Sequence, residues 1–175
     1  ADMTWDSRRE HLVGVRETHD AVSEPVNQLV AIDCRTGAVD VVHSGHDFYS
    51  SPRLSSDAER LAFLVWDHPN MPWDGNELFV ATLDTTGRIV TETLVAGGVA
   101  ESVFQPEWLT PERLVFVSDA NGYWNLYSYD SSGIYCLNED AADYGTAQWA
   151  FGIRTYIPIS DRVLVANRID KGVAA

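Results

Sequence analysis

The sequence repeats one short pattern at a fixed period. An asparagine opens a short apolar run three times, at Asn27, Asn76 and Asn125, so that successive copies are 49 residues apart. Each run ends in a turn that begins with aspartate and closes with glycine, at 33–37, 84–87 and 130–133. A period of about 40 to 50 residues is typical of stacked supersecondary units, because one unit alone cannot bury its apolar face. Since the apolar runs have strand character, this period predicts a β-propeller.

Each repeat divides into four expected strands, because runs of β-branched and aromatic residues are separated by Gly, Asp and Pro. The expected strands lie at 51–55, 60–66, 78–83 and 89–95 in the second repeat, and at 105–108, 113–118, 125–129 and 134–137 in the third. Two sets of large apolar residues recur at equivalent positions and support the register. The units open with Trp5, Leu54, Trp108 and Trp149. Six or seven residues later come Leu12, Leu61, Leu114 and Tyr156.

These patterns predict an all-β fold, a partial β-propeller of four-stranded antiparallel blades within a single domain, 1–175. Three blades are complete and part of a fourth follows, at about 1–45, 46–98, 99–140 and 141–170. Because a closed ring needs about 4 to 8 blades, the open blade edges require a partner. Further blades of a longer parent chain are one solution, and a homodimer through the open edges is another. The strand-like start at Ala1, without a signal peptide, indicates an internal piece of a longer protein.

The charge balance excludes some partners. The chain has 26 acidic and 12 basic residues, for a formal net charge of −14. Nucleic acids and anionic membrane surfaces attract clustered Lys and Arg, so neither is an expected partner. No apolar run reaches the roughly 18 residues of a membrane span, and we expect a cytoplasmic location. Cys34 and Cys136 have no partner pattern around them, and we expect both to face blade interiors as small apolar residues.

No metal or cofactor is predicted. His43 and His46 stand three apart beside Asp47, a spacing that brings side chains together on a helix but sends them to opposite faces of a strand. No calcium-loop pattern occurs, and Gly97-Gly98 precedes no helix that could hold a phosphate.

Four segments carry a resemblance to a known family. They are Trp66-Asp67-His68-Pro69-Asn70-Met71-Pro72-Trp73-Asp74-Gly75, the run 101–108, the stretch 47–55 with 61–63, and 116–119 with 122–127. Together they resemble the propeller of prolyl-oligopeptidase-type serine peptidases, in particular the bacterial dipeptidyl-aminopeptidase and acylaminoacyl-peptidase branch. The resemblance covers nearly the whole chain. The loop 66–75 and the run 101–108 are its specific parts, whereas TolB-like propellers share the others.

The resemblance implies a two-domain enzyme in which an α/β-hydrolase domain carries a Ser-Asp-His triad and the propeller filters substrates. This sequence has no G-x-S-x-G nucleophile elbow; the nearest fragment, 131–133, belongs to a hairpin turn. We therefore expect a non-catalytic propeller portion, inactive alone, that gates and selects peptide substrates for an absent hydrolase domain. One alternative is a TolB-like protein-interaction propeller with no enzymatic role. Another is a propeller glycosidase with carboxylates about 5 to 9.5 Å apart.

The candidate binding residues come from blade topology. In an up-and-down blade, the loop between the second and third strands emerges on the same face as the link to the next blade. That face gathers acids and tryptophans, which could hold a peptide's ammonium group and its apolar side chain. The candidates are Glu101 first, then Asp67, Asp74, Asp119, Trp73 and Trp124, with Asp47 and Trp66 nearby. The competing interpretation is that the tryptophans pin their own loops and the acids cap turns.

Overall fold

A computed structural model describes residues 1–21 and 24–174. In these residues the regular structure is all β, and three sheets each contain four antiparallel strands in chain order. The first sheet holds β1 (Thr4–Asp6), β2 (His11–Thr18), β3 (Val26–Asp33) and β4 (Val39–His43). The second holds β5 (Phe48–Leu54), β6 (Arg60–Trp66), β7 (Glu77–Leu83) and β8 (Ile89–Gly97). The third holds β9 (Val103–Trp108), β10 (Leu114–Ser118), β11 (Asn125–Asp130) and β12 (Gly133–Cys136).

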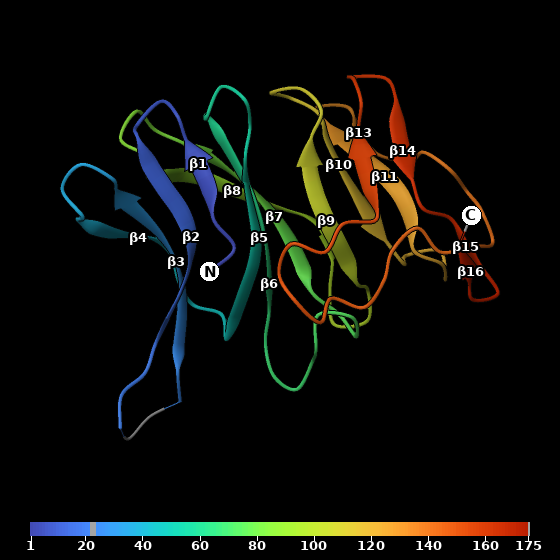
Figure 1. The fold of residues 1–175 in the computed structure, drawn as a ribbon, viewed down its shortest axis with the longest axis horizontal. Coiled ribbons are helices and arrows are strands. Elements are labelled where there is room, and N and C mark those ends of the chain that lie inside the picture. The colour runs from blue at the N-terminus through green and yellow to red at the C-terminus, as the bar shows by residue number, and fades with distance from the viewer. Residues whose placement is uncertain (22–23, 175) are drawn as a thin grey trace.

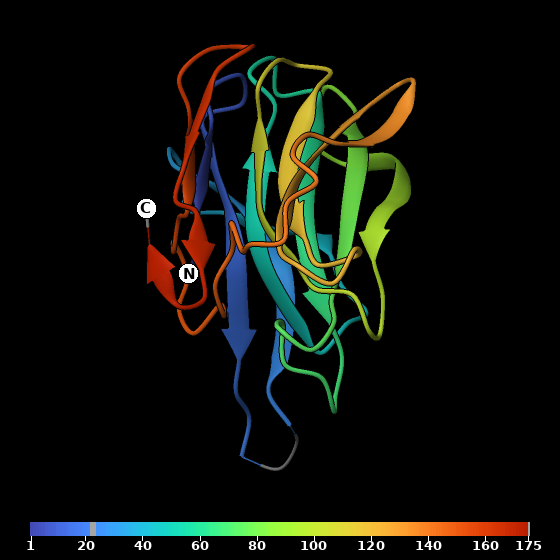
Figure 2. The same cartoon turned by 90° about the vertical axis from the view of Figure 1, so that its right-hand side faces the viewer.

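Two short strand pairs follow the third sheet. β13 (Tyr156–Pro158) pairs with β14 (Leu164–Ala166), and β15 (Ile169–Asp170) pairs with β16 (Val173–Ala174). The sheets stand side by side, from blue β1–β4 to red β13–β16 (Figure 1). Their strands run along one common direction, vertical in Figure 2. The prediction of a partial propeller with sheets that do not close into a ring is therefore confirmed.

The ladder of blade-opening residues is right in three units and wrong in the fourth. In the first three units the two predicted positions are equivalent and lie opposite each other on neighbouring strands. Trp5 pairs with Leu12, Leu54 with Leu61, and Trp108 with Leu114. In the fourth unit Trp149 lies in a loop, and the pair at this level is Pro158 with Leu164. Pro158 stands where the pattern predicts a large apolar residue. Trp149, seven residues before Tyr156, matches the predicted spacing and is therefore assigned to this position by the sequence pattern.

The core forms where neighbouring sheets pack face to face. Leu61, Phe63 and Val65 of β6 point toward the first sheet, and Ala62 and Leu64 point toward the third. All five are fully buried. Side chains of a strand alternate between faces, and this sheet is covered on both, which is why β6 is a continuous apolar run. Full burial of one large apolar side chain contributes about 1.5–3 kcal/mol.

The same alternation repeats in β10 one sheet further on. Leu114 and Phe116 pack toward the second sheet, whereas Val115 and Val117 pack toward Tyr156 of the fourth unit. The two ends of the array lack such cover. On the first sheet Trp5 is 51% exposed, and on the β13–β14 pair Val165 is 59% exposed.

The repeated asparagines clamp one sheet to the next. The side-chain amide of Asn76 donates to the carbonyl of Val103 (2.9 Å), and its oxygen accepts from the Val103 N–H (2.7 Å). The amide of Asn27 donates to the Asp47 carbonyl (2.7 Å). Asn125 bonds in the same way to the chain at 140–142. All three side chains are buried, so the sequence repeat marks the hydrogen bonds that set the blade spacing.

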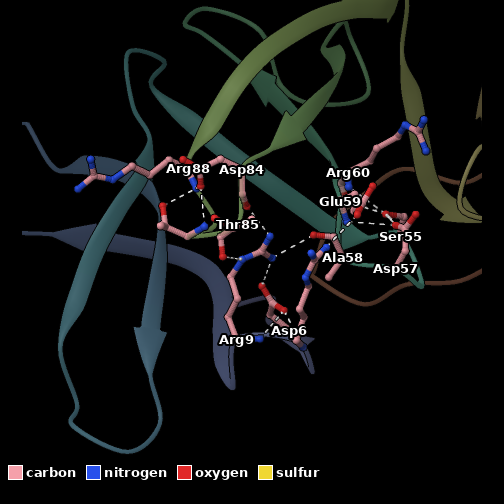
Figure 3. A network of polar contacts seen from close by, with 12 residues as sticks. Asp6, Arg9, Ser55, Asp57, Ala58, Glu59, Arg60, Asp84, Thr85 and Arg88 are labelled. Carbon is pink, nitrogen blue, oxygen red and sulfur yellow. Dashed lines mark hydrogen bonds and ion pairs between the residues drawn. The ribbon is translucent and has the colours of Figure 1, made fainter.

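At the opposite end, arginines join the turns of neighbouring sheets. We call the turns 7–10, 55–59, 109–113 and 159–163 the turn end. Here the Arg9 guanidinium pairs with Asp6 (2.6 Å), and these side chains are only 5% and 2% exposed. Arg9 also donates to the carbonyls of Ala58 (3.0 Å) and Asp84 (2.6 Å) in the second sheet's turns (Figure 3).

The arginine contact recurs along the array. Arg60 donates to the carbonyl of Pro111 (2.7 Å), and Arg113 donates to that of Asp161 (3.4 Å). Each acceptor lies three residues before the leucine that opens the second strand of its sheet. The last turn carries Arg162, whose side chain is 86% exposed.

The expectation for the two cysteines is wrong. Cys34 lies in the turn between β3 and β4, Cys136 lies on β12, and both are free and exposed. Turns and outermost strands of the blades project into solvent, so these positions lie outside the packed faces. Within residues 1–21 and 24–174, no helix is long and apolar enough to cross a membrane.

Candidate functional site

A cavity of about 380 Å³ lies between the second and third sheets, beneath the segment 148–153. Five of its thirteen described lining residues are aromatic: Trp66, Trp73, Phe104, Trp149 and Phe151. Met71, Pro72 and Ile153 add apolar surface, and none of the described lining residues is charged. Ligand sites in proteins are commonly apolar hollows of about 300–1,000 Å³ with a few placed polar groups. The volume and the lining of this aromatic cavity fall within that description.

Two loops far apart in sequence close the aromatic cavity. The rings of Trp73, in the β6–β7 loop, and Trp149 lie with their centroids 4.2 Å apart, tilted by 41°. The side-chain amide of Gln148 donates to the Val103 carbonyl (2.9 Å), which ties the second loop to β9. The Ser102 hydroxyl donates to the Pro72 carbonyl (2.9 Å) and holds the first loop. The Trp149 side chain nevertheless remains largely exposed.

Ser50 of β5 supplies an unusual polar group beside the aromatic cavity. The residue is only 5% exposed, and its hydroxyl has no hydrogen-bond partner among the described residues. A buried polar group without a partner costs about 1–3 kcal/mol. Such a cost is tolerated where a ligand can supply the missing partner.

The backbone next to Ser50 is strained in a repeating way. Asp2, Ser51 and Gln105 each precede the blade-opening residue by three, and their φ angles are +46°, +53° and +49°. Side chains other than glycine rarely adopt this left-handed conformation. At Ser51 the chain bulges between Ser50 and Arg53, and the Ser51 N–H donates to the Asp2 carboxylate. Strained positions that the fold enforces are often found at binding sites.

Two of the predicted acids lie in a set of His–Asp pairs between loops. The Asp67 carboxylate contacts the His46 ring (2.9 Å) and accepts from the Asp47 N–H (2.7 Å). Asp47 in turn contacts the His68 ring (3.0 Å) and accepts the His68 N–H (2.9 Å). These donations from His68 hold the pKa of Asp47 below its usual value. The pairs join the link before β5 to the β6–β7 loop.

The expected geometry of His43 and His46 is wrong. Their rings stack with centroids 6.1 Å apart and an angle of 13°. His43 ends β4 and His46 lies in the following link, so strand alternation does not separate them. Among the described residues, no group of three or more His, Cys, Asp or Glu side chains could hold a metal ion.

Glu101 and Asp119 form a second acidic group. Glu101 accepts a hydrogen bond from the Ser118 hydroxyl (2.6 Å), and Asp119 accepts one from the Ser102 N–H (2.7 Å). Burial raises the pKa of Asp119; the Ser102 N–H opposes this, and the nearby Glu101 carboxylate adds to the rise. Trp124 lines a shallow hollow with Asp119 and packs against Gly145, where a Cβ would lie 2.7 Å from the indole ring.

The structure thus separates the six predicted residues into four places. Trp73 lines the aromatic cavity, while Asp74 caps its own turn by accepting the Met71 N–H (3.0 Å). Asp67 belongs to the His–Asp pairs, and Glu101, Asp119 and Trp124 lie together beside the third sheet. Their role in substrate binding stays a prediction. Sequence reasoning did not find Ser50, Phe104, Trp149 and Phe151, because no periodic pattern relates 148–153 to the β6–β7 loop.

The chain is similar in structure to peptidases over almost its whole length. A puromycin-hydrolysing peptidase from Mycobacterium tuberculosis shares 31% identity with a TM-score of 0.89, over 96% of this chain and 28% of that one. A puromycin hydrolase solved in complex with PGG shares 26% identity with a TM-score of 0.85, over 99% of this chain and 30% of that one. The chain therefore spans less than a third of the length of either enzyme.

A more distant match shows the fold alone. The β-propeller domain of the trilobed protease from Pyrococcus furiosus shares 16% identity with a TM-score of 0.56, over 95% of this chain and 47% of that one. No protein-family model matches the chain, and no curated protein sequence matches it.

Proposed function

Because the chain is a β-propeller segment of the prolyl-oligopeptidase-type serine peptidase family, we propose that it admits and selects peptide-type substrates for an α/β-hydrolase domain. The catalytic triad would belong to that domain. The similarity to two puromycin-hydrolysing enzymes, at 26% and 31% identity over nearly the whole chain, carries this proposal. The aromatic cavity supports it, since loops held by a rigid scaffold are where binding residues concentrate.

In this proposal the turn end holds the blades together and the opposite end binds the substrate. The turn end is held by buried arginine contacts, whereas the opposite end carries longer loops, the His–Asp pairs and the tryptophans of the aromatic cavity. The hydrolase would face the loop end, defined here as the loops 44–47, 66–76, 97–102 and 119–124. Carboxylates there would bind the substrate's ammonium group, and the net charge of −14 would favour cationic substrates in general.

Genetic context and reconstitution test the proposal. We expect the genomic region that encodes the chain to encode a G-x-S-x-G hydrolase in the same reading frame or beside it. Expressed together, the two parts should hydrolyse puromycin and dipeptidyl p-nitroanilides. The Glu101→Gln variant of the propeller should raise KM several-fold while kcat changes little, because uniform binding of substrate and transition state is lost.

Two results would overturn the proposal. One is the absence of any hydrolase in that region. The other is a reconstituted enzyme whose substrate preference does not change with any variant at the loop end. Stable capture of a protein partner, without an effect on hydrolysis, would instead favour an interaction propeller.

A further inference from the structure

The chemistry of the aromatic cavity narrows what it can bind. Five of its thirteen described lining residues are aromatic, and none of the thirteen carries a charge. A charged group that enters would lose water without gaining an ion pair. An aromatic ring would gain offset or edge-to-face contacts with the wall, which aliphatic groups of similar size do not make.

The arrangement of the two tryptophans also argues against a cage for a cation. The ring centroids of Trp73 and Trp149 lie 4.2 Å apart, so the two indoles contact each other and do not face an open gap from opposite sides. Asp74, which follows Trp73 in the sequence, caps the Met71 N–H and is not part of the cavity wall. An uncharged planar group is the better match.

Ser50 adds an independent sign of a ligand. Its side chain is buried beside the aromatic cavity, and its hydroxyl lacks a partner among the described residues. The neighbouring Ser51 holds the left-handed backbone that places this pair at the wall. Because the hydroxyl oxygen is itself buried, it would hydrogen-bond to an amide or carbonyl group attached to the bound ring after the Ser50 side chain rotates toward the cavity.

We propose that the aromatic cavity binds an uncharged aromatic side chain of a peptide-type ligand, with the Ser50 hydroxyl bonded to a neighbouring amide group. That the ligand is peptide-like rests on the proposed function; the preference for an uncharged ring rests on the cavity alone. Segment 148–153 forms the outer wall and Trp149 is its main contact.

Calorimetric titration of the 175-residue chain with three ligands that undergo no reaction tests this inference. The probes are N-acetyl-phenylalaninamide, N-acetyl-leucinamide and N-acetyl-lysinamide, which share a backbone and differ in the side chain. We expect a dissociation constant of about 1 mM for the phenylalanine probe, as is usual for a ligand of this size. The leucine probe should bind about tenfold more weakly, and the lysine probe should show no saturable binding.

Two variants locate the site. Trp149→Ala should weaken binding of the phenylalanine probe about tenfold, and the fold should survive because this side chain is 76% exposed. Ser50→Ala should weaken it about three- to tenfold by removing one hydrogen bond. Trp5→Ala is the matched control, since Trp5 lies on the first sheet outside the aromatic cavity, and it should leave the affinity unchanged.

Leucine binding as tight as phenylalanine, tighter lysine binding, no binding of any probe, or unchanged affinity in Trp149→Ala would each overturn the inference. These results are distinct from those that test the proposed function. If the chain prefers the phenylalanine probe but no associated hydrolase exists, this inference is supported and the proposed function is refuted. If the reconstituted peptidase is active but has no preference for aromatic side chains, the proposed function is supported and this inference is refuted.

Discussion

The turn end and the loop end of the blades come from the same repeat but are held by different chemistry. At the turn end, Arg9, Arg60 and Arg113 each donate to a main-chain carbonyl of the next sheet's turn. At the loop end, the repeated asparagines also bond to main-chain groups. There, in addition, side chains of the loops contact each other through His–Asp pairs and a pair of tryptophans. Carbonyl acceptors are present whatever the sequence, whereas side-chain pairs depend on it. The comparison shows how an array can keep its geometry at one end while the other end varies to suit a ligand.

The largest loss of folding stability is expected from a substitution at the turn end. Arg9→Ala leaves Asp6, which is only 2% exposed, as a buried charge without its partner. Loss of one member of a buried ion pair costs about 3–5 kcal/mol, and urea denaturation at neutral pH should show it. Arg162→Ala is the control, because an 86% exposed arginine should change stability by less than about 0.5 kcal/mol. Equal costs for the two variants would mean that the arginine contacts do not hold the array.

A smaller loss is expected where the repeated asparagine clamps two sheets. Asn76→Ala leaves the buried N–H of Val103 without its partner and removes one of the two donors to the Val103 carbonyl, the other being Gln148. We expect a cost of about 2–4 kcal/mol. Asn27→Ala removes one such bond and should cost about 1–2 kcal/mol. Denaturation midpoints with unchanged m-values would measure both. The reverse order would contradict the role assigned to the repeat.

A pH-dependent effect is expected at the edge between the first and second sheets. Burial lowers the pKa of His43; the Glu92 carboxylate opposes this and the His46 ring adds to it. The ring also lies 2.9 Å from the Tyr49 hydroxyl. Since the folded state releases the His43 proton more readily than the unfolded state, stability is fully present above the ordinary pKa of 6.5 and declines as the pH falls below it.

The variant that tests this is His43→Gln. Its melting temperature should fall less than that of the wild type between pH 7 and pH 5. Parallel curves for the two proteins would assign the acid sensitivity to another group.

The smallest effect on stability is expected in the aromatic cavity. Trp149→Ala should change the free energy of unfolding by less than about 0.5 kcal/mol, because the side chain is largely exposed. Trp108→Ala provides the contrast with the same residue type near the turn end. Its ring packs against the core and its Nε1–H donates to the Arg53 carbonyl (2.9 Å), so a loss of about 3 kcal/mol is expected. A comparable loss for Trp149 would show that it is structural.

The fold was predictable because the repeat records physical contacts. The asparagines recur since each bonds to the chain near its entry into the next unit: Asn27 to Asp47, Asn76 to Val103 and Asn125 to Ala142. Apolar runs such as β6 recur since neighbouring sheets cover both of its faces. The fourth unit was harder because Pro158 takes the place of a large apolar residue, and Trp149 supplied a false signal seven residues before Tyr156.

The candidate site was predictable only in part. Blade topology placed Trp73 at the loop end, and the structure places it in the aromatic cavity. The meeting of Trp73 with Trp149 depends on how the irregular segment 148–153 folds back over β9, which periodicity does not describe. Likewise, no local sequence signal distinguishes the unpartnered Ser50 hydroxyl from other strand serines.

The uncovered faces at both ends of the array set how the molecule opens. In a linear stack each sheet is stabilised by its neighbours alone, and the central strand β6 has neighbours on both faces. Amide protons of β6 should exchange with solvent through global unfolding, whereas those of β1 and β13–β16 exchange through fraying of the ends. We therefore expect protection of amide protons from exchange to be highest in the middle sheet and lowest in the first and last strands.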